Sequence, residues 1–191
     1  MASRTGDTRE EIVRLGMEFI QTYGYNAFSY ADIAKKLNIK NAAVHYHFPG
    51  KEDLLIEIVG QYIQRYHDLA RALEAPGLTS RKRIQAFIDR YTTLCDQGKI
   101  CLIGSVGSDY FTMPETVKEK LGELVELVLG MVEGVLRDGK KKGEFSFPET
   151  PRVRALLMMT NLAAGVQLAR ITGQKDYKAI CNSLVKQLAD T

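Results

Sequence analysis

The sequence predicts an all-helical protein of about nine or ten helices. Through most of its 191 residues, apolar side chains recur at three- and four-residue steps, the spacing of one face of an α-helix. No segment alternates apolar and polar residues for long enough to predict a β-strand. No unit of roughly 20–50 residues is repeated. The predicted fold class is therefore all-α, and each helix can be placed by its apolar stripe and by the residues at its ends.

The composition indicates a protein that folds around a core and works in the cytoplasm. Hydrophobic residues make up 45% of the chain and charged residues 26%. No apolar run approaches the roughly 18–20 residues that span a bilayer, and the polar start MASRTGDTREE lacks the apolar segment of a signal peptide. The three cysteines form no CxxC pair, which argues against a thiolate metal site. We expect a cytoplasmic protein with no membrane segment, no metal and no cofactor.

The first helix is predicted to begin at Thr8 and to end before Gly24. Thr8 and Glu11 have the spacing of a capping box, in which side chains bind the free N–H groups of the first turn. Apolar residues then follow on one face from Ile12 to Tyr23. Gly24 suits the left-handed residue that ends many helices.

Two short helices follow, joined by a tight turn. Ser29 is a good N-cap, and Asp32 three residues later makes a weaker capping box. This helix ends near Leu37, and Asn38 tolerates the left-handed conformation of a turn. The next helix is expected at about 41–47.

The remaining helices are placed by the same signs, with N-caps, prolines and glycines at their ends. We expect one helix from Lys51 to the break at 74–79 and another from Ser80 to about Cys95. One short helix is expected within 98–113, and a long one from Pro114 to about 138. The last two helices are expected at about 152–172 and in the stretch that ends near Leu188.

The two short helices and the amphipathic helix before them are the parts of a helix-turn-helix that binds DNA. Ala34 is small enough to let the pair approach, and Ala42 and Ala43 leave room for the second helix to lie close to base edges. Three lysines lie around the turn, where phosphates of bound DNA would be: Lys35, Lys36 and Lys40. The segment therefore predicts double-stranded DNA as a partner.

The segment from Thr8 to Tyr62 resembles the N-terminal domain of the TetR family of bacterial transcriptional repressors. Three motifs in a fixed order carry the resemblance: TREEI, GYNAFSYADIA and IKNAAVHYHFPGKEDLL. The resemblance implies a three-helix helix-turn-helix domain for DNA binding at 1–50. It also implies a larger helical domain for ligand binding and dimerisation at 51–191.

The same resemblance implies which residues contact DNA. Ser29 and Tyr30 would meet phosphate at the start of the second helix, and Tyr46 and Lys51 would hold the DNA backbone. Four residues would face the major groove: Lys40, Asn41, Ala43 and His45. Because the family usually has an aromatic residue where His45 stands, the resemblance does not predict which operator sequence this protein binds.

Beyond this domain the resemblance is one of architecture. It implies a ligand pocket among the central helices and a homodimer formed through a helical bundle. The helices at about 115–138 and 152–172 suit that interface, because both would otherwise expose apolar surface. A dimer would place two recognition helices roughly 34–36 Å apart on a palindrome. The alternative is that both helices belong to the core of a monomer.

Cys101 lies close to Lys99 in the stretch GKICLIGSVGSDYF. The arrangement resembles regulators of the N-ethylmaleimide reductase repressor type, and a cation beside a thiol makes it reactive, so Cys101 would sense electrophiles or oxidants. The alternative is a buried, inert cysteine. Five aromatic residues would either line a ligand cavity or simply belong to the core: Tyr62, Tyr66, Tyr91, Tyr110 and Phe111.

The sequence contains no P-loop, HExxH or GxSxG motif, so we expect no catalytic residues and no enzyme. We predict a ligand-responsive transcriptional repressor of the TetR type that binds a palindromic operator as a dimer. A small-molecule or thiol-reactive inducer of unknown identity would release it. Two alternatives keep the same fold: a transcriptional activator, and a DNA-binding protein that needs no ligand.

Overall fold

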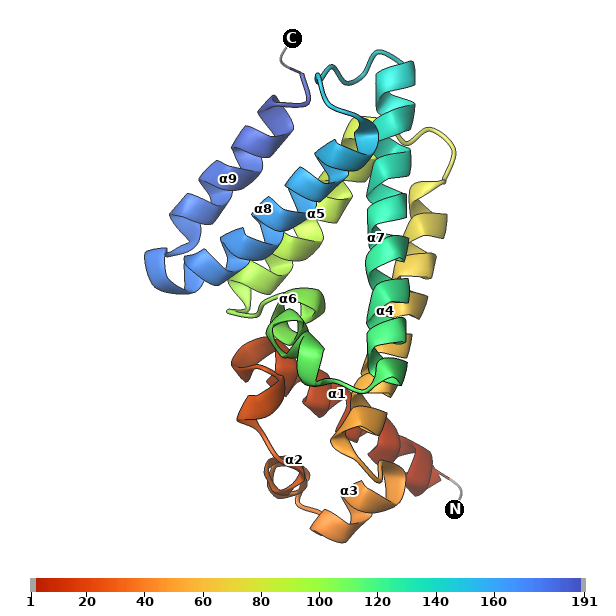
Figure 1. The fold of residues 1–191 in the computed structure, drawn as a ribbon, viewed down its shortest axis with the longest axis vertical. Coiled ribbons are helices and arrows are strands. Elements are labelled where there is room, and N and C mark those ends of the chain that lie inside the picture. The colour runs from red at the N-terminus through yellow and green to blue at the C-terminus, as the bar shows by residue number, and fades with distance from the viewer. Residues whose placement is uncertain (1–2, 190–191) are drawn as a thin grey trace. The chain divides into compact units, whose positions relative to one another are not determined.

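The computed structural model describes the backbone of residues 3–189 and the side chains of residues 7–189. That part of the chain contains nine α-helices, two 3-10 helices and no β-strand, which confirms the predicted all-α fold (Figure 1). The helices form two compact units, one of Met1–Gln64 and Leu102–Leu124 and the other of Arg65–Cys101 and Val125–Thr191. These units do not follow a division at residue 50, and that domain boundary stays a prediction.

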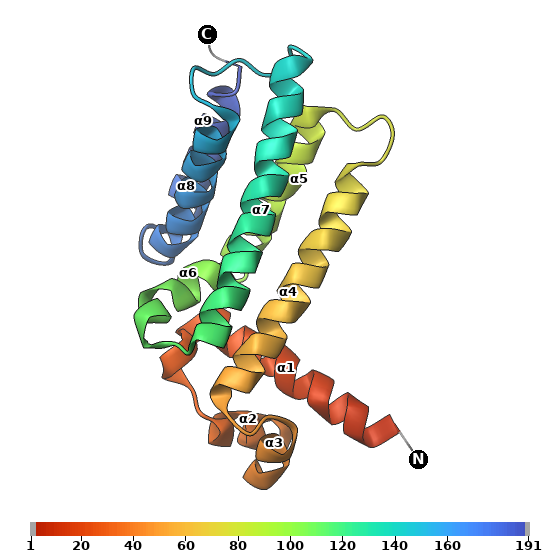
Figure 2. The ribbon, with the colours of Figure 1, turned by 45° about the vertical axis from the view of Figure 1, so that its right-hand side comes forward.

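The first unit is built on three N-terminal helices. Its elements are α1 (Ser3–Tyr23), η1 (Tyr25–Ala27), α2 (Tyr30–Leu37), α3 (Asn41–His47), the start of α4 (Lys51–Leu73), α6 (Leu102–Val106), η2 (Gly107–Thr112) and the start of α7 (Glu115–Lys141). α2 and α3 lie side by side, with α1 packed on both (Figures 1 and 2).

Fully buried aliphatic side chains hold these helices together. They come from α1, α2, α3 and α4, and include Ile12, Ile20, Ile33, Val44, Leu54 and Leu55. Burial of one such side chain stabilises a fold by about 1.5–3 kcal/mol. Since isolated helices as short as α2 and α3 are marginal in water, this core is what keeps them folded.

The predicted ends of α2 are confirmed. Asp32 Oδ2 accepts a hydrogen bond from the Ser29 backbone N–H at 2.8 Å, which completes the capping box. Asn38 has φ 54° and ψ 45°, the left-handed conformation that the turn requires. These contacts lie within a few residues in the sequence, and they fix where α2 begins and ends.

The predicted start of the first helix is wrong. α1 begins at Ser3, so Thr8 lies inside the helix and is not its cap. Glu11 instead accepts a hydrogen bond from Arg14 Nη2 at 2.7 Å, a pair one turn apart on the helix surface.

The second unit contains the end of α4, α5 (Ser80–Asp96), the rest of α7, α8 (Pro151–Thr172) and α9 (Gln174–Lys186). α8 packs on both α5 and α9, and the three helices lie side by side in Figure 1. Gly165 lets α8 and α9 approach closely, because a β-carbon there would lie 3.2 Å from Cδ2 of the buried Tyr177.

The loop between α7 and α8 joins distant parts of this unit. Glu144 accepts hydrogen bonds from Ser80 Oγ at 3.2 Å and from the Arg81 backbone N–H at 3.3 Å, at the start of α5. A carboxylate at a helix N-terminus stabilises the helix by about 0.3–1 kcal/mol. The Ser146 backbone N–H donates to Leu188 O at 2.8 Å, so the loop also holds the chain after α9.

Among the described helices, α8 alone is long and apolar enough to cross a membrane, with a mean hydropathy of 1.2 over 18 residues. This differs from the expectation that no segment qualifies. It is weak evidence for a membrane span, because core helices pass the same test. Arg154 near the start of α8 is only 6% exposed and pairs with Glu149 at 2.6 Å, which ties that end of the helix into the protein.

Candidate nucleic-acid interface and effector sites

α2 and α3 form a helix-turn-helix whose second helix has one free face. The Ile39 backbone N–H donates to Ala34 O at 3.0 Å and closes the turn between them. Val44 anchors α3 with none of its surface exposed, whereas Asn41 and His45 are exposed. The core contact of Val44 therefore decides which side of α3 is free to meet a partner.

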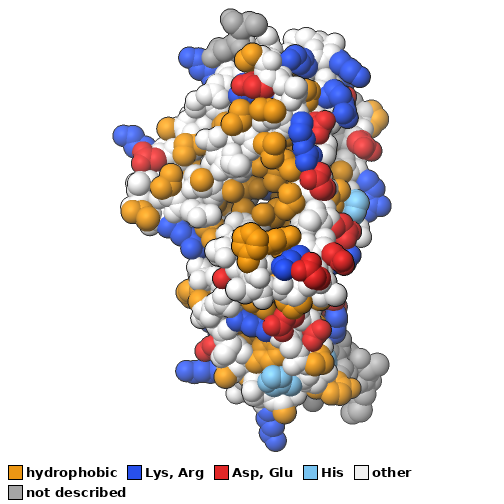
Figure 3. Space-filling model, viewed as in Figure 1, with side chains coloured by type: hydrophobic (Ala, Val, Ile, Leu, Met, Phe, Trp, Pro, Cys, Tyr) orange, Lys and Arg blue, Asp and Glu red, His pale blue; other side chains and the backbone are white. Residues whose placement is uncertain are grey.

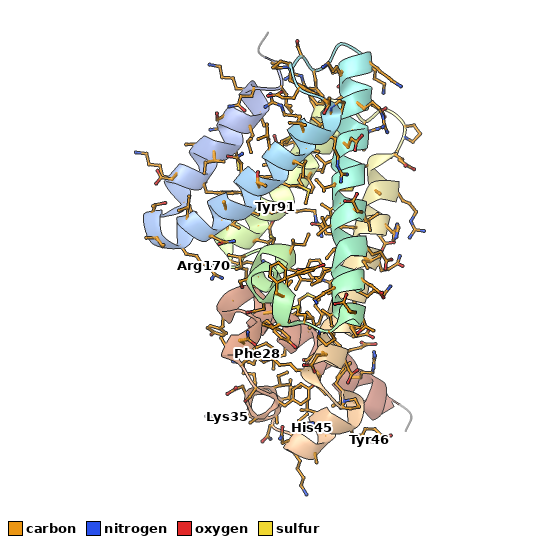
Figure 4. All side chains as sticks on the ribbon, in the orientation of Figure 1. Phe28, Lys35, His45, Tyr46, Tyr91 and Arg170 are labelled. Atoms are coloured by element: carbon orange, nitrogen blue, oxygen red, sulfur yellow. The ribbon has the colours of Figure 1, made fainter. Side chains whose placement is uncertain are left out.

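The residues predicted to face the major groove lie on that side. Lys40, Asn41 and His45 are exposed, and Ala43 is partly exposed. Tyr46, predicted to hold the DNA backbone, is 78% exposed. Figure 4 shows His45 and Tyr46 on α3 at the end of the first unit. All five side chains are accessible, and their contacts with DNA stay a prediction.

His45 is held in place although it is exposed. Its ring stands edge-on to the ring of Tyr30, with 4.8 Å between the centroids, and its Nδ1 lies 3.3 Å from Pro49 O. His47 is partly buried, and its ring contacts that of Tyr46 at 5.2 Å. The two histidines of α3 therefore have separate surroundings.

Ser29 and Tyr30, predicted to meet phosphate, both have partners within the protein. The Ser29 hydroxyl donates to Asp32 Oδ2 at 2.7 Å, and this bond lowers the pKa of Asp32. The Tyr30 hydroxyl donates to Gly50 O, and burial raises the pKa of Tyr30. Ser29 is exposed but Tyr30 is only 7% exposed, so Tyr30 is better placed to support the helix pair than to reach DNA.

Lys51, also predicted to hold the DNA backbone, points into the first unit. Its ammonium donates to the carbonyl oxygens of Tyr25 and Phe28. Nζ lies 4.0 Å from the centroid of the Phe28 ring and 4.8 Å from that of Tyr25. Burial lowers the pKa of Lys51 and raises that of Tyr25 to about 12. A phosphate contact by Lys51 therefore competes with these internal partners.

The sequence did not predict a groove beside α2. It has a volume of about 550 Å³ and is lined by Phe19, Tyr23, Ala27, Phe28, Asp32, Lys35 and Lys36. Phe28 and Lys35 are labelled in Figure 4. The rings of Phe19 and Tyr23 contact each other at 5.9 Å along α1, and their four-residue spacing in the sequence shows only that they share one helix face.

Three of the predicted effector residues lie in the second unit and are buried there. Tyr66, Tyr91 and Cys101 are 7%, 2% and 7% exposed. Burial raises the pKa of both tyrosines, and the Cys101 side chain contributes to both shifts. Arg90, which the sequence reading missed, places its guanidinium 5.1 Å from the centroid of the Tyr66 ring. The structure thus brings two phenols, a thiol and a cation together.

The other three predicted effector residues lie in the first unit and differ from one another. Tyr62 is partly buried and accepts a hydrogen bond from Gln21 Nε2 at 2.7 Å. Tyr110 is 39% exposed and Phe111 is 91% exposed, with 5.6 Å between their ring centroids. Phe111 is therefore neither a core aromatic nor part of an enclosed cavity wall within this unit.

The two helices predicted to form a dimer interface differ in exposure. α8 leaves large apolar side chains exposed along one face: Val153, Leu156, Leu157, Leu168 and Ile171. Figure 3 shows hydrophobic side chains on the surface that carries α8. The apolar stripe of α7 is buried instead, through Val117, Leu121, Leu124, Val128, Val132 and Val135. Large exposed apolar side chains are therefore found on 152–172, whereas on 115–138 apolar residues such as Val125 and Met131 are only partly exposed, and a dimer contact through either helix stays a prediction.

Comparison with known proteins agrees with this geometry. Residues 12–58 match the family model described as "Bacterial regulatory proteins, tetR family". The chain is similar to the structure of a TetR-family transcriptional regulator from Agrobacterium tumefaciens, with a TM-score of 0.90 and 25% identity over 97% of this chain and 100% of that one. For a TetR transcriptional regulator from Legionella pneumophila, the TM-score is 0.83 with 28% identity over 94% and 96%. The chain is also 21% identical to the fatty acid metabolism regulator protein of Bacillus subtilis, over 93% of this chain and 92% of that protein.

Proposed function

Because residues 12–58 match the model of the TetR family of bacterial regulatory proteins, we propose that the chain is a ligand-responsive transcriptional repressor that binds a palindromic operator as a homodimer. The free face of α3 carries this proposal, since Asn41, His45 and Tyr46 are exposed on a helix that Val44 anchors. An α-helix fits the major groove of B-DNA, where polar side chains read base edges.

The exposure of each residue indicates whether it contacts base edges or phosphate at this interface. Lys40, Asn41 and His45 read base edges, and the small side chain of Ala43 lets α3 lie close to the groove. Ser29 and Tyr46 contact phosphate, because both are exposed at the margins of the helix pair. Phosphate contacts supply affinity and fix the register, whereas base contacts supply the sequence preference.

The exposed face of α8 supports a homodimer through 152–172. We assign the second interface helix to α9 in preference to 115–138, because the apolar residues of α7 are already buried. A groove of about 180 Å³ runs between α8 and α9, lined by Leu157, Asn161, Ile180, Ser183, Leu184 and Gln187. In a two-fold dimer the same patch of each subunit meets its copy. Two α3 helices would then lie roughly 34–36 Å apart, one turn of DNA.

The inducer is proposed to bind at the buried group formed by Tyr66, Tyr91 and Cys101. Its phenols offer directed hydrogen bonds within an apolar environment, as ligand pockets commonly do. The name of the Bacillus subtilis relative makes fatty acids and their derivatives the first class to screen. Whatever its identity, an inducer can release the operator only by binding the two states of the dimer with different affinity.

Covalent modification of Cys101 is a second proposed route to release. Its partners include Tyr91, and its low exposure of 7% admits only small reagents or a transient opening. We propose that the protein works in the cytoplasm, where its operator lies, and carries out no catalysis. The relatives found by comparison are named as regulators.

Selection of duplexes from a random DNA library by the purified protein tests the proposal. We expect the selected sites to converge on a palindrome that binds one dimer, as measured by gel shift and light scattering. A reporter gene placed behind that site then distinguishes repression from activation. Turnover of generic acyl esters without binding to any duplex would overturn the proposal.

A further inference from the structure

Lys51 joins the first turn of α4 to the segment that precedes α2. Its ammonium donates to the carbonyls of Tyr25 and Phe28 and lies over both of their rings, at 4.8 Å and 4.0 Å from the two centroids. Hydrogen bonds from a charged donor are about twice as strong as neutral ones, and an aromatic ring attracts a cation near its face.

A second contact joins the same two segments. The Tyr30 hydroxyl donates to Gly50 O, so residues 25–30 are tied to residues 50–51 at both ends. The ring of Tyr30 in turn stands against the ring of His45 on α3, with 4.8 Å between the centroids. The start of α4 is thereby linked to the exposed face of α3 through the contacts of the Tyr30 side chain.

We propose that Lys51 is a positioning residue for operator reading, which holds segment 25–30 and through Tyr30 the orientation of α3, and that it does not bind phosphate. The proposal rests on the DNA-binding function proposed above. It departs from the phosphate contact that the family resemblance implies for this position.

The surroundings of the ammonium disfavour a phosphate partner. Two of the three ammonium donors of Lys51 are occupied by charge-assisted hydrogen bonds to these carbonyls, so a phosphate would find one donor left or would have to displace a carbonyl. Asp32, Glu52 and Asp109 are also near enough to interact electrostatically with Lys51. These carboxylates already supply negative charge to Lys51, and they would repel a phosphate brought close to it.

The salt dependence of operator binding distinguishes positioning from phosphate contact. Each phosphate that a cation neutralises contributes about −0.9 to the slope of log K against log salt concentration. We expect Lys51→Met to lower the affinity for the selected duplex about tenfold, which corresponds to about 1.4 kcal/mol, with no change in slope. Lys36→Met is the matched control, because Lys36 is exposed at the end of α2, where phosphates of bound DNA are expected, and its loss should reduce the slope by about 0.9.

Two results from this series would overturn the proposal. A slope reduced by about 0.9 in Lys51→Met would show a phosphate contact. An unchanged affinity would show that Lys51 positions nothing that matters for binding.

Lysine acetylation followed by mass spectrometry gives a test that needs no variant, should Lys51→Met fail to fold. In the wild-type protein we expect Lys51 to react slowly with and without the selected duplex, and Lys40 to react quickly unless the duplex is bound. Fast labelling of Lys51 that the duplex blocks would contradict the inference. If the wild-type protein selects no duplex, the DNA-binding proposal fails, and slow labelling would still report the internal site of Lys51.

Discussion

The ring of Phe145 occupies the space that a side chain on Gly139 would need. A β-carbon built on Gly139 would lie 2.1 Å from Cδ2 of Phe145, far inside van der Waals contact. Phe145 is only 4% exposed and belongs to the loop that caps α5 through Glu144. Glycine is therefore required at this position by packing in the last turns of α7.

Gly139→Ala is expected to destabilise the second unit. Overpacking of a well-filled core costs about 1–3 kcal/mol, and 1 kcal/mol lowers the Tm of a protein of this size by about 2–4 °C. The control is Gly130→Ala, also in α7, where nothing apart from the neighbouring backbone of the helix itself lies within 4 Å of the new β-carbon. That change should raise stability by about 0.5–1 kcal/mol, because glycine weakens a helix interior. Equal Tm shifts for the two variants, measured by thermal unfolding, would contradict this account.

Asn41→Ala and Tyr46→Ala are expected to affect DNA binding in different ways. Loss of a base contact at Asn41 should cost about 1–3 kcal/mol on the preferred site and relax the preference at one position of each half-site. Loss of Tyr46, which is 78% exposed, should weaken binding evenly across sequences and leave the Tm unchanged. Library selection with each variant measures both effects. A preference unchanged by Asn41→Ala would remove Asn41 from the base-reading set.

Leu156→Glu is expected to break the dimer. It puts a charge into the exposed apolar face of α8, where a buried unpaired carboxylate would be costly. Light scattering should show a monomer, and operator affinity should fall because the two half-sites no longer bind together. Phe111→Glu is the control, since Phe111 is 91% exposed in the first unit and lies outside the proposed interface. A dimer that survives Leu156→Glu would rule out this part of α8 as the contact.

Cys101→Ser is expected to leave operator binding intact and to abolish release by thiol reagents. N-ethylmaleimide is the probe, and gel shift with the selected duplex is the measurement. Cys95→Ser and Cys181→Ser serve as controls, and both should keep any response that the wild-type protein shows. If Cys101→Ser responds like the wild-type protein, the thiol-sensing route does not pass through Cys101.

The helix-turn-helix could be predicted almost residue by residue because its signals are local. Ser29 and Asp32 fix the start of α2, and Asn38 fixes its end, through contacts no more than a few residues apart. The same logic failed at Thr8, where the helix continues past a good capping sequence to Ser3. A local capping pattern marks a place where a helix can begin, but it does not prevent a longer helix.

The roles of Lys51 and Glu144 could not be read from the sequence, because their partners are distant. Lys51 binds a carbonyl 26 residues away, and Glu144 binds a hydroxyl 64 residues away. The apolar residues of α7 and α8 likewise predicted excess apolar surface on both helices without showing what covers it. Only the fold shows that α7 is covered within the chain and that α8 keeps a free face.

The first unit is discontinuous in the chain, since it needs Leu102–Leu124 as well as the N-terminal helices. During synthesis, the recognition helix leaves the ribosome long before α6 and the start of α7 that complete its unit. At roughly 5–20 residues per second, the nascent helix-turn-helix waits for several seconds with part of its core uncovered. A fragment ending at residue 50 would remain in that unfinished state, so a DNA-binding module taken from this protein should extend at least to Leu124.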